Sequence, residues 1–144
     1  MNLKKLTEDI KQEEGFRDIP YTDHLGNWTI GWGHLIKSNE HFERDKKYSY
    51  QHLEKVLNYD LNIAVGDAKL LCSNMDLPDK CVEIVAHMCF QLGKPKTAKF
   101  KKMFEALRKK DYINAGFEME DSQWAKQTPQ RAMRLSERMK SLKE

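Results

Sequence analysis

Two carboxylates and one hydroxyl near the start of the chain are of the types that could carry acid–base chemistry. Glu14 ends a stretch with helical periodicity, Asp23 lies in a polar turn sequence, and Thr29 follows in a stretch with strand periodicity. In hydrolysis of a glycosidic bond one carboxyl protonates the leaving oxygen and the other activates water or attacks the sugar. A helix end and a neighbouring hairpin could therefore flank one substrate bond.

The position of Glu14 suits a proton donor. Residues 3–14 place Leu3 and Ile10 on one helical stripe, and Glu14 lies almost on that line, in the last turn. Partial burial and the helix dipole both oppose a negative charge there, so the side chain is suited to be a general acid. The alternative is an ordinary solvated glutamate. Because Glu13 flanks the same stripe, periodicity alone does not choose between the two residues.

Local structural roles are the alternatives for Asp23 and Thr29. An Asp before a turn often accepts a hydrogen bond from nearby backbone, as in an Asx turn. Over residues 28–33 apolar side chains alternate with Thr29, Gly31 and Gly33, so a strand would place the hydroxyl in a bare trough that could hold a sugar ring. Close packing of a glycine-rich hairpin against another element explains the same pattern.

Periodicity and the breakers Gly and Pro predict the elements that hold these groups. In chain order they are a helix over 3–14 closed by Gly15, an antiparallel sheet within 21–34, a loop or short irregular helix over 37–48, a long helix over 49–71 capped by Ser49, and helices that begin near Pro78, Phe100, Tyr112 and Thr128. The predicted fold class is α+β, with a small sheet lobe and a helical lobe joined by the long helix.

Length and composition fit one compact domain. The chain has 144 residues, 40% hydrophobic and 33% charged, which excludes a collagen-like or disordered protein. We expect a single domain over 1–144, in which the sheet lobe (about 15–48) and the helical lobe (about 72–144, with the N-terminal helix) are joined by the linking helix (about 49–71). Without an apolar stretch of membrane-spanning length or a signal peptide, we expect synthesis in the cytoplasm and no membrane anchor.

Charge and cysteine content narrow the classes of partner and cofactor. The formal net charge is +3, but residues 94–144 hold 14 basic and 7 acidic residues, which indicates an anionic polymer partner unless these lysines simply form solvated helical faces. Cys72, Cys81 and Cys89 are odd in number and form no CxxC pair, so we expect them to be reduced and buried. The histidines show no metal-ligand spacing, and neither a metal nor another cofactor is expected.

Several motifs resemble the phage-type lysozyme family, that of the T-even phages. Glu14-Gly15-Phe16-Arg17 is followed by Tyr21-x-Asp23-x-x-Gly26 and by Trp28-Thr29-Ile30-Gly31-Trp32-Gly33-His34-Leu35. Two later blocks resemble the family in the same order: Phe90-Gln91-Leu92-Gly93 and Trp124-x-x-Gln127-Thr128-Pro129-x-Arg131-Ala132. The resemblance covers nearly the whole chain and implies a lysozyme-like fold.

This resemblance implies a muramidase of the endolysin type, which cleaves the β-1,4 bond between N-acetylmuramic acid and N-acetylglucosamine in peptidoglycan. Glu14 then matches the general acid, Asp23 the second catalytic carboxylate, and Thr29 the residue that positions the attacking water. The implied substrate-binding residues are Gly33, Leu35, Phe90, Gln91 and Arg131. We expect a monomer without nucleic acid as a partner, which reaches the cell wall once the inner membrane is breached.

The chain also departs from the family pattern. By this resemblance residues 35–48 are shorter than in related family members, so a helix of the sheet lobe is expected to be missing. Met103 and Glu118 stand where those family members have small polar residues that contact the substrate. These departures are expected to affect how tightly the substrate subsites bind the glycan and which attached peptide is preferred. The alternatives to an active muramidase are a catalytically silent peptidoglycan-binding or scaffold module of the same fold, and a nucleic-acid binder that uses the basic residues 94–144.

One further pair of residues is predicted from the long helix. Asp60 falls within its apolar stripe, near the positions of Leu57 and Ala64, and a carboxylate there needs a partner unless it reaches solvent at the edge of the stripe. His34 at the end of the hairpin is the natural candidate, and the resemblance matches the two residues to a structural ion pair. If the pair forms, we expect a raised pKa of His34 and the greatest stability at mildly acidic pH.

Overall fold

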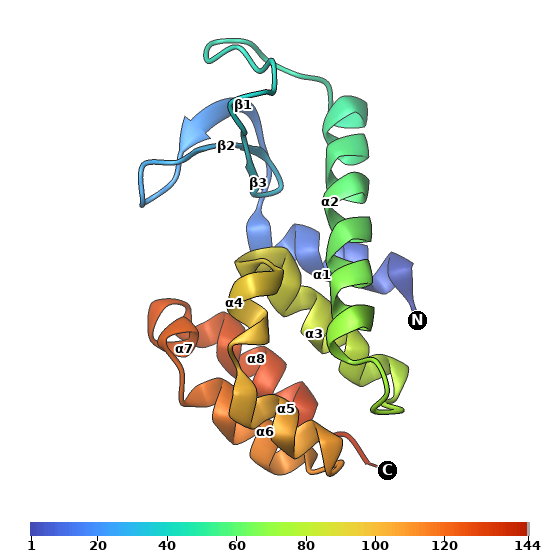
Figure 1. The fold of residues 1–144 in the computed structure, drawn as a ribbon. Helices are drawn as coiled ribbons and strands as arrows, with labels where there is room; N and C mark the ends of the chain where they lie inside the picture. Colours follow the sequence, from blue (N-terminus) through green and yellow to red (C-terminus); the bar gives the residue numbers. More distant parts are fainter. Residues whose placement is uncertain (144) are drawn as a thin grey trace. The chain divides into compact units, whose positions relative to one another are not determined.

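The computed structural model describes residues 1–143, which form eight helices and one three-stranded antiparallel sheet (Figure 1). The elements are α1 (Leu3–Glu14), β1 (Arg17–Thr22), β2 (Trp28–Gly31), β3 (His34–Leu35), α2 (Tyr50–Leu71), α3 (Asp79–Leu92), α4 (Lys94–Ala98), α5 (Lys101–Arg108), α6 (Tyr112–Glu120), α7 (Gln123–Gln127) and α8 (Pro129–Lys140). The α+β fold class predicted from the sequence is confirmed.

Two compact units divide the chain inside α2. The first, Asn2–Asn62, holds α1, the sheet and the first part of α2, and the second begins at Ile63 and also includes Met1. In this division α1 belongs to the unit of the sheet, whereas the sequence placed it with the helical lobe. The organisation as a single domain stays a prediction.

Helix α1 has the bounds that its sequence predicts. The Asn2 side chain accepts a hydrogen bond from the backbone N–H of Lys5 at 3.1 Å and so caps the N-terminus. Leu6 and Ile10 are buried on one stripe. Gly15 ends the helix because its φ of 69° lies in the left-handed region, which costs glycine little.

The sheet has the order β1-β2-β3, and it is shorter than the alternation of residues 28–33 predicts. Tyr21 pairs with Thr29, and Thr29 pairs with Leu35. Strand β2 ends at Gly31 because Gly31 and Gly33 have φ values of 65° and 71°, which turn the backbone away from the extended conformation. The expected trough beside Thr29, Gly31 and Gly33 on one strand face is therefore wrong.

Residues 36–48 form a loop with turns and without a helix, which agrees with the expected absence of a helix from this segment. The loop is held to β1 by the hydrogen bond from the backbone N–H of Tyr48 to the carbonyl of Asp18, at 2.9 Å. Ser49 then caps α2 by accepting from the backbone N–H of His52 at 3.1 Å. Within the first unit Leu53 and Leu57 of α2 are buried, and Leu53 packs on Gly31.

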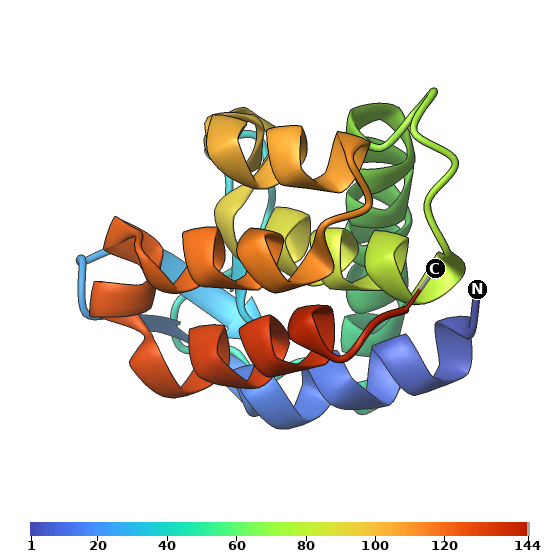
Figure 2. The same cartoon turned by 90° about the horizontal axis from the view of Figure 1, so that it is seen from below.

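In the second unit α6 lies between α5 and α8 (Figure 2). Gly116 makes the contact of α6 with α8 close: a Cβ at this position would lie 2.9 Å from the carbonyl oxygen of Ser136. Met103, Leu107, Met119 and Met139 are fully buried in the core of this unit. The helices expected near Pro78, Phe100, Tyr112 and Thr128 are present, with Pro78 as the N-cap residue instead of the first helical residue.

All three cysteines are free and buried, as predicted. Burial raises the pKa of Cys72 and Cys81 to about 12 and that of Cys89 to about 11, so the thiols are protonated near neutral pH. Within residues 1–143, no helix combines the length and the apolar character needed to cross a membrane.

Candidate active site

Glu14 is half-buried at the end of α1, and Gly33 gives its carboxyl room. A Cβ at residue 33 would lie 2.5 Å from Oε1 of Glu14 and 2.9 Å from its Cδ, so any other side chain would collide with the carboxyl group. The φ of 71° at Gly33 also favours glycine. The backbone between β2 and β3 therefore forms a wall against which the Glu14 carboxyl rests.

Asp23 accepts two backbone hydrogen bonds in the turn between β1 and β2. The N–H groups of Leu25 and Asn27 both donate to its Oδ1, each at 2.9 Å. These bonds, that from Asn27 first, hold the pKa of Asp23 below its ordinary value. The local hydrogen bonding considered as an alternative role is thus present, and it also keeps Asp23 ionised, with Oδ2 outside both bonds.

Asn27 connects Asp23 to Thr29. Its backbone N–H donates to Asp23, and its carbonyl oxygen accepts the Thr29 hydroxyl at 3.0 Å. Thr29 is only 3% exposed, and because its proton is directed to Asn27, its oxygen lone pairs remain to accept a hydrogen bond. The Asn27 side chain adds a smaller lowering of the pKa of Asp23. Asn27 was not among the predicted site residues, since its main contribution comes from backbone atoms that any residue has.

Tyr21 lies within electrostatic reach of both catalytic candidates. Burial, and after it the negative charge of Glu14, raises the pKa of Tyr21; Arg17 acts in the opposite direction and Asp23 adds a smaller rise. The Arg17 guanidinium lies over the Tyr21 ring, 4.6 Å from its centroid. Tyr21 was not among the predicted site residues, although it stands in the Tyr21-x-Asp23 motif.

His34 is the first residue of β3, and its side chain contacts Asp60 of α2. Its Nδ1 is 2.6 Å from Oδ2 of Asp60, and the two side chains are 10% and 23% exposed. Burial alone lowers the pKa of His34, but hydrogen bonding and the charge of Asp60, followed by those of Glu40, outweigh it and raise the pKa above its ordinary value. Glu40, which the sequence did not single out, is therefore a second partner of His34.

The remaining predicted substrate-binding residues divide between the two units. Gly33 and Leu35 lie in the first unit, and Leu35 is 52% exposed on β3. In the second unit Phe90 is half-buried near the end of α3 and Arg131 is buried on α8. Gln91 accepts a hydrogen bond from Trp124 Nε1 at 2.9 Å and donates to Thr128 at 3.3 Å, so its amide is oriented by two partners.

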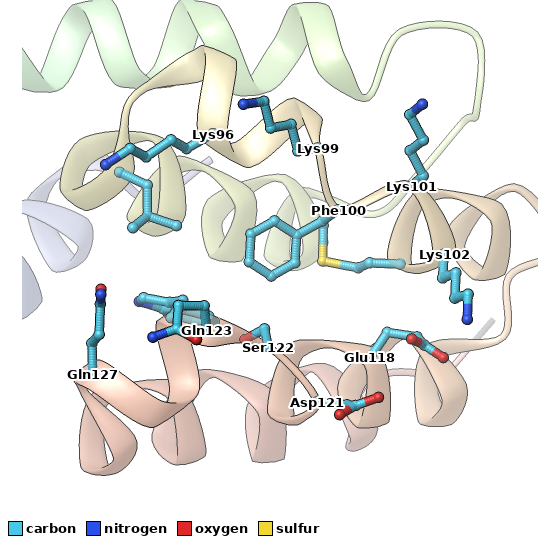
Figure 3. A pocket seen from close by; sticks show the side chains of 13 residues that line it. Lys96, Lys99, Phe100, Lys101, Lys102, Glu118, Asp121, Ser122, Gln123 and Gln127 are labelled. Carbon is cyan, nitrogen blue, oxygen red and sulfur yellow. The ribbon is translucent and has the colours of Figure 1, made fainter.

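A pocket of about 550 Å³ opens in the second unit (Figure 3). Lysines from α4, α5 and the segment between them line one side and face Glu118 and Asp121 across it, and Phe100 and Trp124 contribute aromatic surface. Met103 also lines the pocket. The two residues that depart from the family pattern, Met103 and Glu118, thus belong to the same pocket. Among residues 1–143, no group of three or more His, Cys, Asp and Glu side chains is placed to hold a metal ion.

The model of the phage lysozyme family matches residues 11–141. The chain belongs to the phage lysozyme family. It is 27% identical to probable T4-type lysozyme 2 of Dictyostelium discoideum over 92% of each chain, and 25% identical to probable T4-type lysozyme 1 of the same organism. It is also 29% identical to the pre-baseplate central spike protein Gp5 of Enterobacteria phage T4, over 91% of this chain and 27% of that protein. The general activity of the phage lysozyme family, glycoside hydrolysis of the lysozyme type, therefore applies to this chain.

Gly33→Ala is expected to misplace the Glu14 carboxyl. The new Cβ would collide with Oε1, and the left-handed φ adds strain of about 1–2 kcal/mol. If Glu14 is the general acid, as expected, lysozyme activity should fall about 100-fold while the protein still folds. Gly26→Ala is the matched control, because its φ is 83° and no atom lies within 4 Å of the new Cβ. Turbidity clearing and thermal unfolding of both variants measure the effects. Equal losses of activity in the two would mean that Gly33 does not position Glu14.

Proposed function

We propose that this protein is a muramidase of the endolysin type, which hydrolyses the β-1,4 bond between N-acetylmuramic acid and N-acetylglucosamine in bacterial peptidoglycan. Membership of the phage lysozyme family supports the reaction class. The observation that carries the proposal is the environment of Asp23: backbone N–H groups keep it ionised, and Asn27 connects it to Thr29. An ionised carboxylate and a hydroxyl acceptor that share one backbone partner could together hold and deprotonate a water.

In this mechanism Glu14 is the general acid and protonates the glycosidic oxygen as the bond to the sugar breaks. Asp23 accepts a proton from the attacking water, because the hydrogen bonds of the turn keep its carboxylate ionised. Thr29 accepts a second hydrogen bond from that water and fixes its direction. The acid and the base thus act on the two faces of the same anomeric carbon.

Gly33, Leu35, Phe90, Gln91 and Arg131 are the proposed contacts with the glycan. Leu35 is exposed enough to pack on a sugar face, and Gln91 offers an amide that Trp124 and Thr128 hold in place. Glu118 introduces a charge and the buried Met103 a thioether in the same pocket, and we propose that these changes alter the preference for the peptide attached to the glycan.

The stereochemistry of the product is the next prediction. If Asp23 activates a water opposite Glu14, the reaction is a single displacement that inverts the anomeric carbon, and the two carboxyls are expected about 6.5–9.5 Å apart in the substrate complex. NMR of the first product from a soluble peptidoglycan fragment should therefore show the α-anomer before mutarotation. An initial β-product, or a covalent glycosyl adduct on Asp23, would mean that Asp23 is the nucleophile.

The activity itself is tested by turbidity of chloroform-permeabilised Gram-negative cells, which should clear with the protein and remain turbid without it. The alternative is a catalytically silent peptidoglycan-binding or scaffold module. The 29% identity to a part of a phage spike protein is the observation that favours this alternative. Such a module would sediment with purified peptidoglycan without clearing the cells. We further propose that the active protein is a monomer, made in the host cytoplasm, that acts after the membrane is permeabilised.

A further inference from the structure

Both nitrogens of the His34 ring face carboxylates. Nδ1 is 2.6 Å from Asp60 Oδ2, while Nε2 is 3.0 and 2.9 Å from the two carboxylate oxygens of Glu40. Ionised carboxylates only accept hydrogen bonds, so both contacts are satisfied together only when the imidazole carries two protons. The arrangement is a carboxylate–imidazolium–carboxylate clamp formed by Asp60, His34 and Glu40.

Glu40 also builds the turn from which it reaches His34. Its Oε1 accepts the backbone N–H of Lys37 at 2.8 Å, and its own N–H donates to the Lys37 carbonyl at 3.0 Å. The ring of Phe42 lies 6.2 Å from the His34 ring and in turn contacts His52 of α2. Among the described residues, Asp60 from α2 and Glu40 from the 36–48 loop are the charged groups that contact His34.

The clamp is connected to the candidate active site through the backbone of β3. His34 pairs with Ile30 of β2, the neighbour of Thr29. It also directly follows Gly33, on which the Glu14 carboxyl rests. A displacement of His34 would therefore be transmitted to the wall behind Glu14 over a single residue.

We propose that Glu40 is a positioning residue: with Asp60 it holds His34 in the clamp and so fixes the start of β3, and with it Gly33, against Glu14. The proposal rests on the proposed muramidase function for its catalytic consequence. Nothing in the sequence indicates this role, because Glu40 lies in an aperiodic loop. In this proposal the 36–48 loop has a specific structural role, because it supplies the second carboxylate that contacts His34.

The protonation state of His34 decides whether the clamp is closed. A neutral imidazole has one N–H and can donate to only one carboxylate. The shorter contact, to Asp60, is expected to persist, so Glu40 is the partner that separates. Because the folded-state pKa of His34 is raised, the clamp is fully present below the unfolded value of about 6.5 and is lost as the pH rises through the folded value. The 36–48 loop should loosen over that range.

The test is an NMR titration of His34 in the wild type, in Glu40→Gln and in Glu43→Gln. Glu40→Gln should lower the pKa of His34, because the amide is uncharged. Glu43→Gln is the matched control: it changes a carboxylate in the same loop whose ion pair, with Lys46 at 4.0 Å, is exposed. An unchanged His34 pKa in Glu40→Gln, or an equal fall in both variants, would overturn the clamp.

The proposed effect of Glu40 on catalysis is measured separately, by the dependence of kcat on pH. In Glu40→Gln the fall of kcat at alkaline pH should begin at a lower pH than in the wild type, with KM little changed. In Glu43→Gln the fall of kcat should begin at the same pH as in the wild type. If the pH profiles of kcat coincide in all three proteins, Glu40 is not a positioning residue. If the wild type proves inactive, the proposed function fails, but the titration still decides the clamp. If Glu40→Gln does not fold, ¹⁵N heteronuclear NOEs of residues 37–48 in the wild type decide it: they should fall as His34 deprotonates, and constant values would contradict the clamp.

Discussion

Replacing Glu14 by Gln is expected to abolish lysis while the protein keeps its fold. The amide has nearly the shape of the carboxyl group and can rest on Gly33 in the same way, but it cannot give an acidic proton to the leaving oxygen. Loss of general-acid catalysis lowers rates about 10²- to 10⁴-fold, equivalent to roughly 3–5 kcal/mol of activation free energy. Turbidity clearing measures the activity, and circular dichroism with thermal unfolding measures the fold.

Glu13→Gln is the matched control for this experiment. Glu13 is also half-buried in the last turn of α1, next to Glu14 in sequence, so it tests whether any carboxyl there is needed. We expect Glu13→Gln to retain most of its activity. Near-normal lysis by a folded Glu14→Gln protein would remove Glu14 from its role, and inactivity of Glu13→Gln alone would transfer that role to Glu13.

The second large effect is expected on stability when the clamp loses Asp60. Removing one member of a well-buried ion pair costs about 3–5 kcal/mol and an exposed pair contributes about 1 kcal/mol or less. Asp60 is 23% exposed and Glu40 remains beside His34, so Asp60→Asn should lower the free energy of unfolding by roughly 2 kcal/mol at pH 6. Urea unfolding of the two proteins measures the difference.

The loss of stability in Asp60→Asn should depend on pH, because the raised pKa of His34 sets the range in which the ion pair forms. Protonated His34 is stabilised in the folded state, so its contribution is fully present below its unfolded pKa and is lost as the pH rises through the raised folded pKa. The gap between wild type and Asp60→Asn should therefore narrow from pH 6 to alkaline pH. Asp67→Asn, on the same helix, is the control and should show no such trend. A gap that stays constant with pH would mean that His34 protonation does not contribute.

Long periodic elements could be predicted from the sequence because their own residues determine them. The Leu6 and Ile10 stripe with Gly15 fixes α1, and Ser49 with the buried Leu53 and Leu57 fixes the start of α2. Helices α4 and α7 were missed because five residues are too few to show a helical period.

The sheet shows where a pattern of residue types misleads. Alternation over residues 28–33 is typical of a strand, but glycine is compatible with a left-handed φ as well as with an extended one, and the chain uses that freedom at Gly31 and Gly33. The same freedom lets the Glu14 carboxyl approach the backbone, a contact between distant parts of the sequence that no local pattern contains.

In the candidate site, the residues with the chemistry could be chosen from the sequence, but most of their partners could not. Glu14, Asp23 and Thr29 have side chains that suggest roles. Asn27 acts mainly through its backbone, and Glu40 reaches His34 only because a turn folds it back, so residue type and spacing did not reveal either role. Such contributions depend on tertiary geometry.

The bond that is cleaved tests the central proposal most directly. Purified peptidoglycan is digested with the protein, reduced with borohydride and hydrolysed in acid, so that each new reducing end is recovered as an amino-sugar alcohol. A muramidase gives muramicitol, and digestion by Glu14→Gln gives none above background. Glucosaminitol as the product, or no new reducing ends with the wild type, would contradict the proposed function.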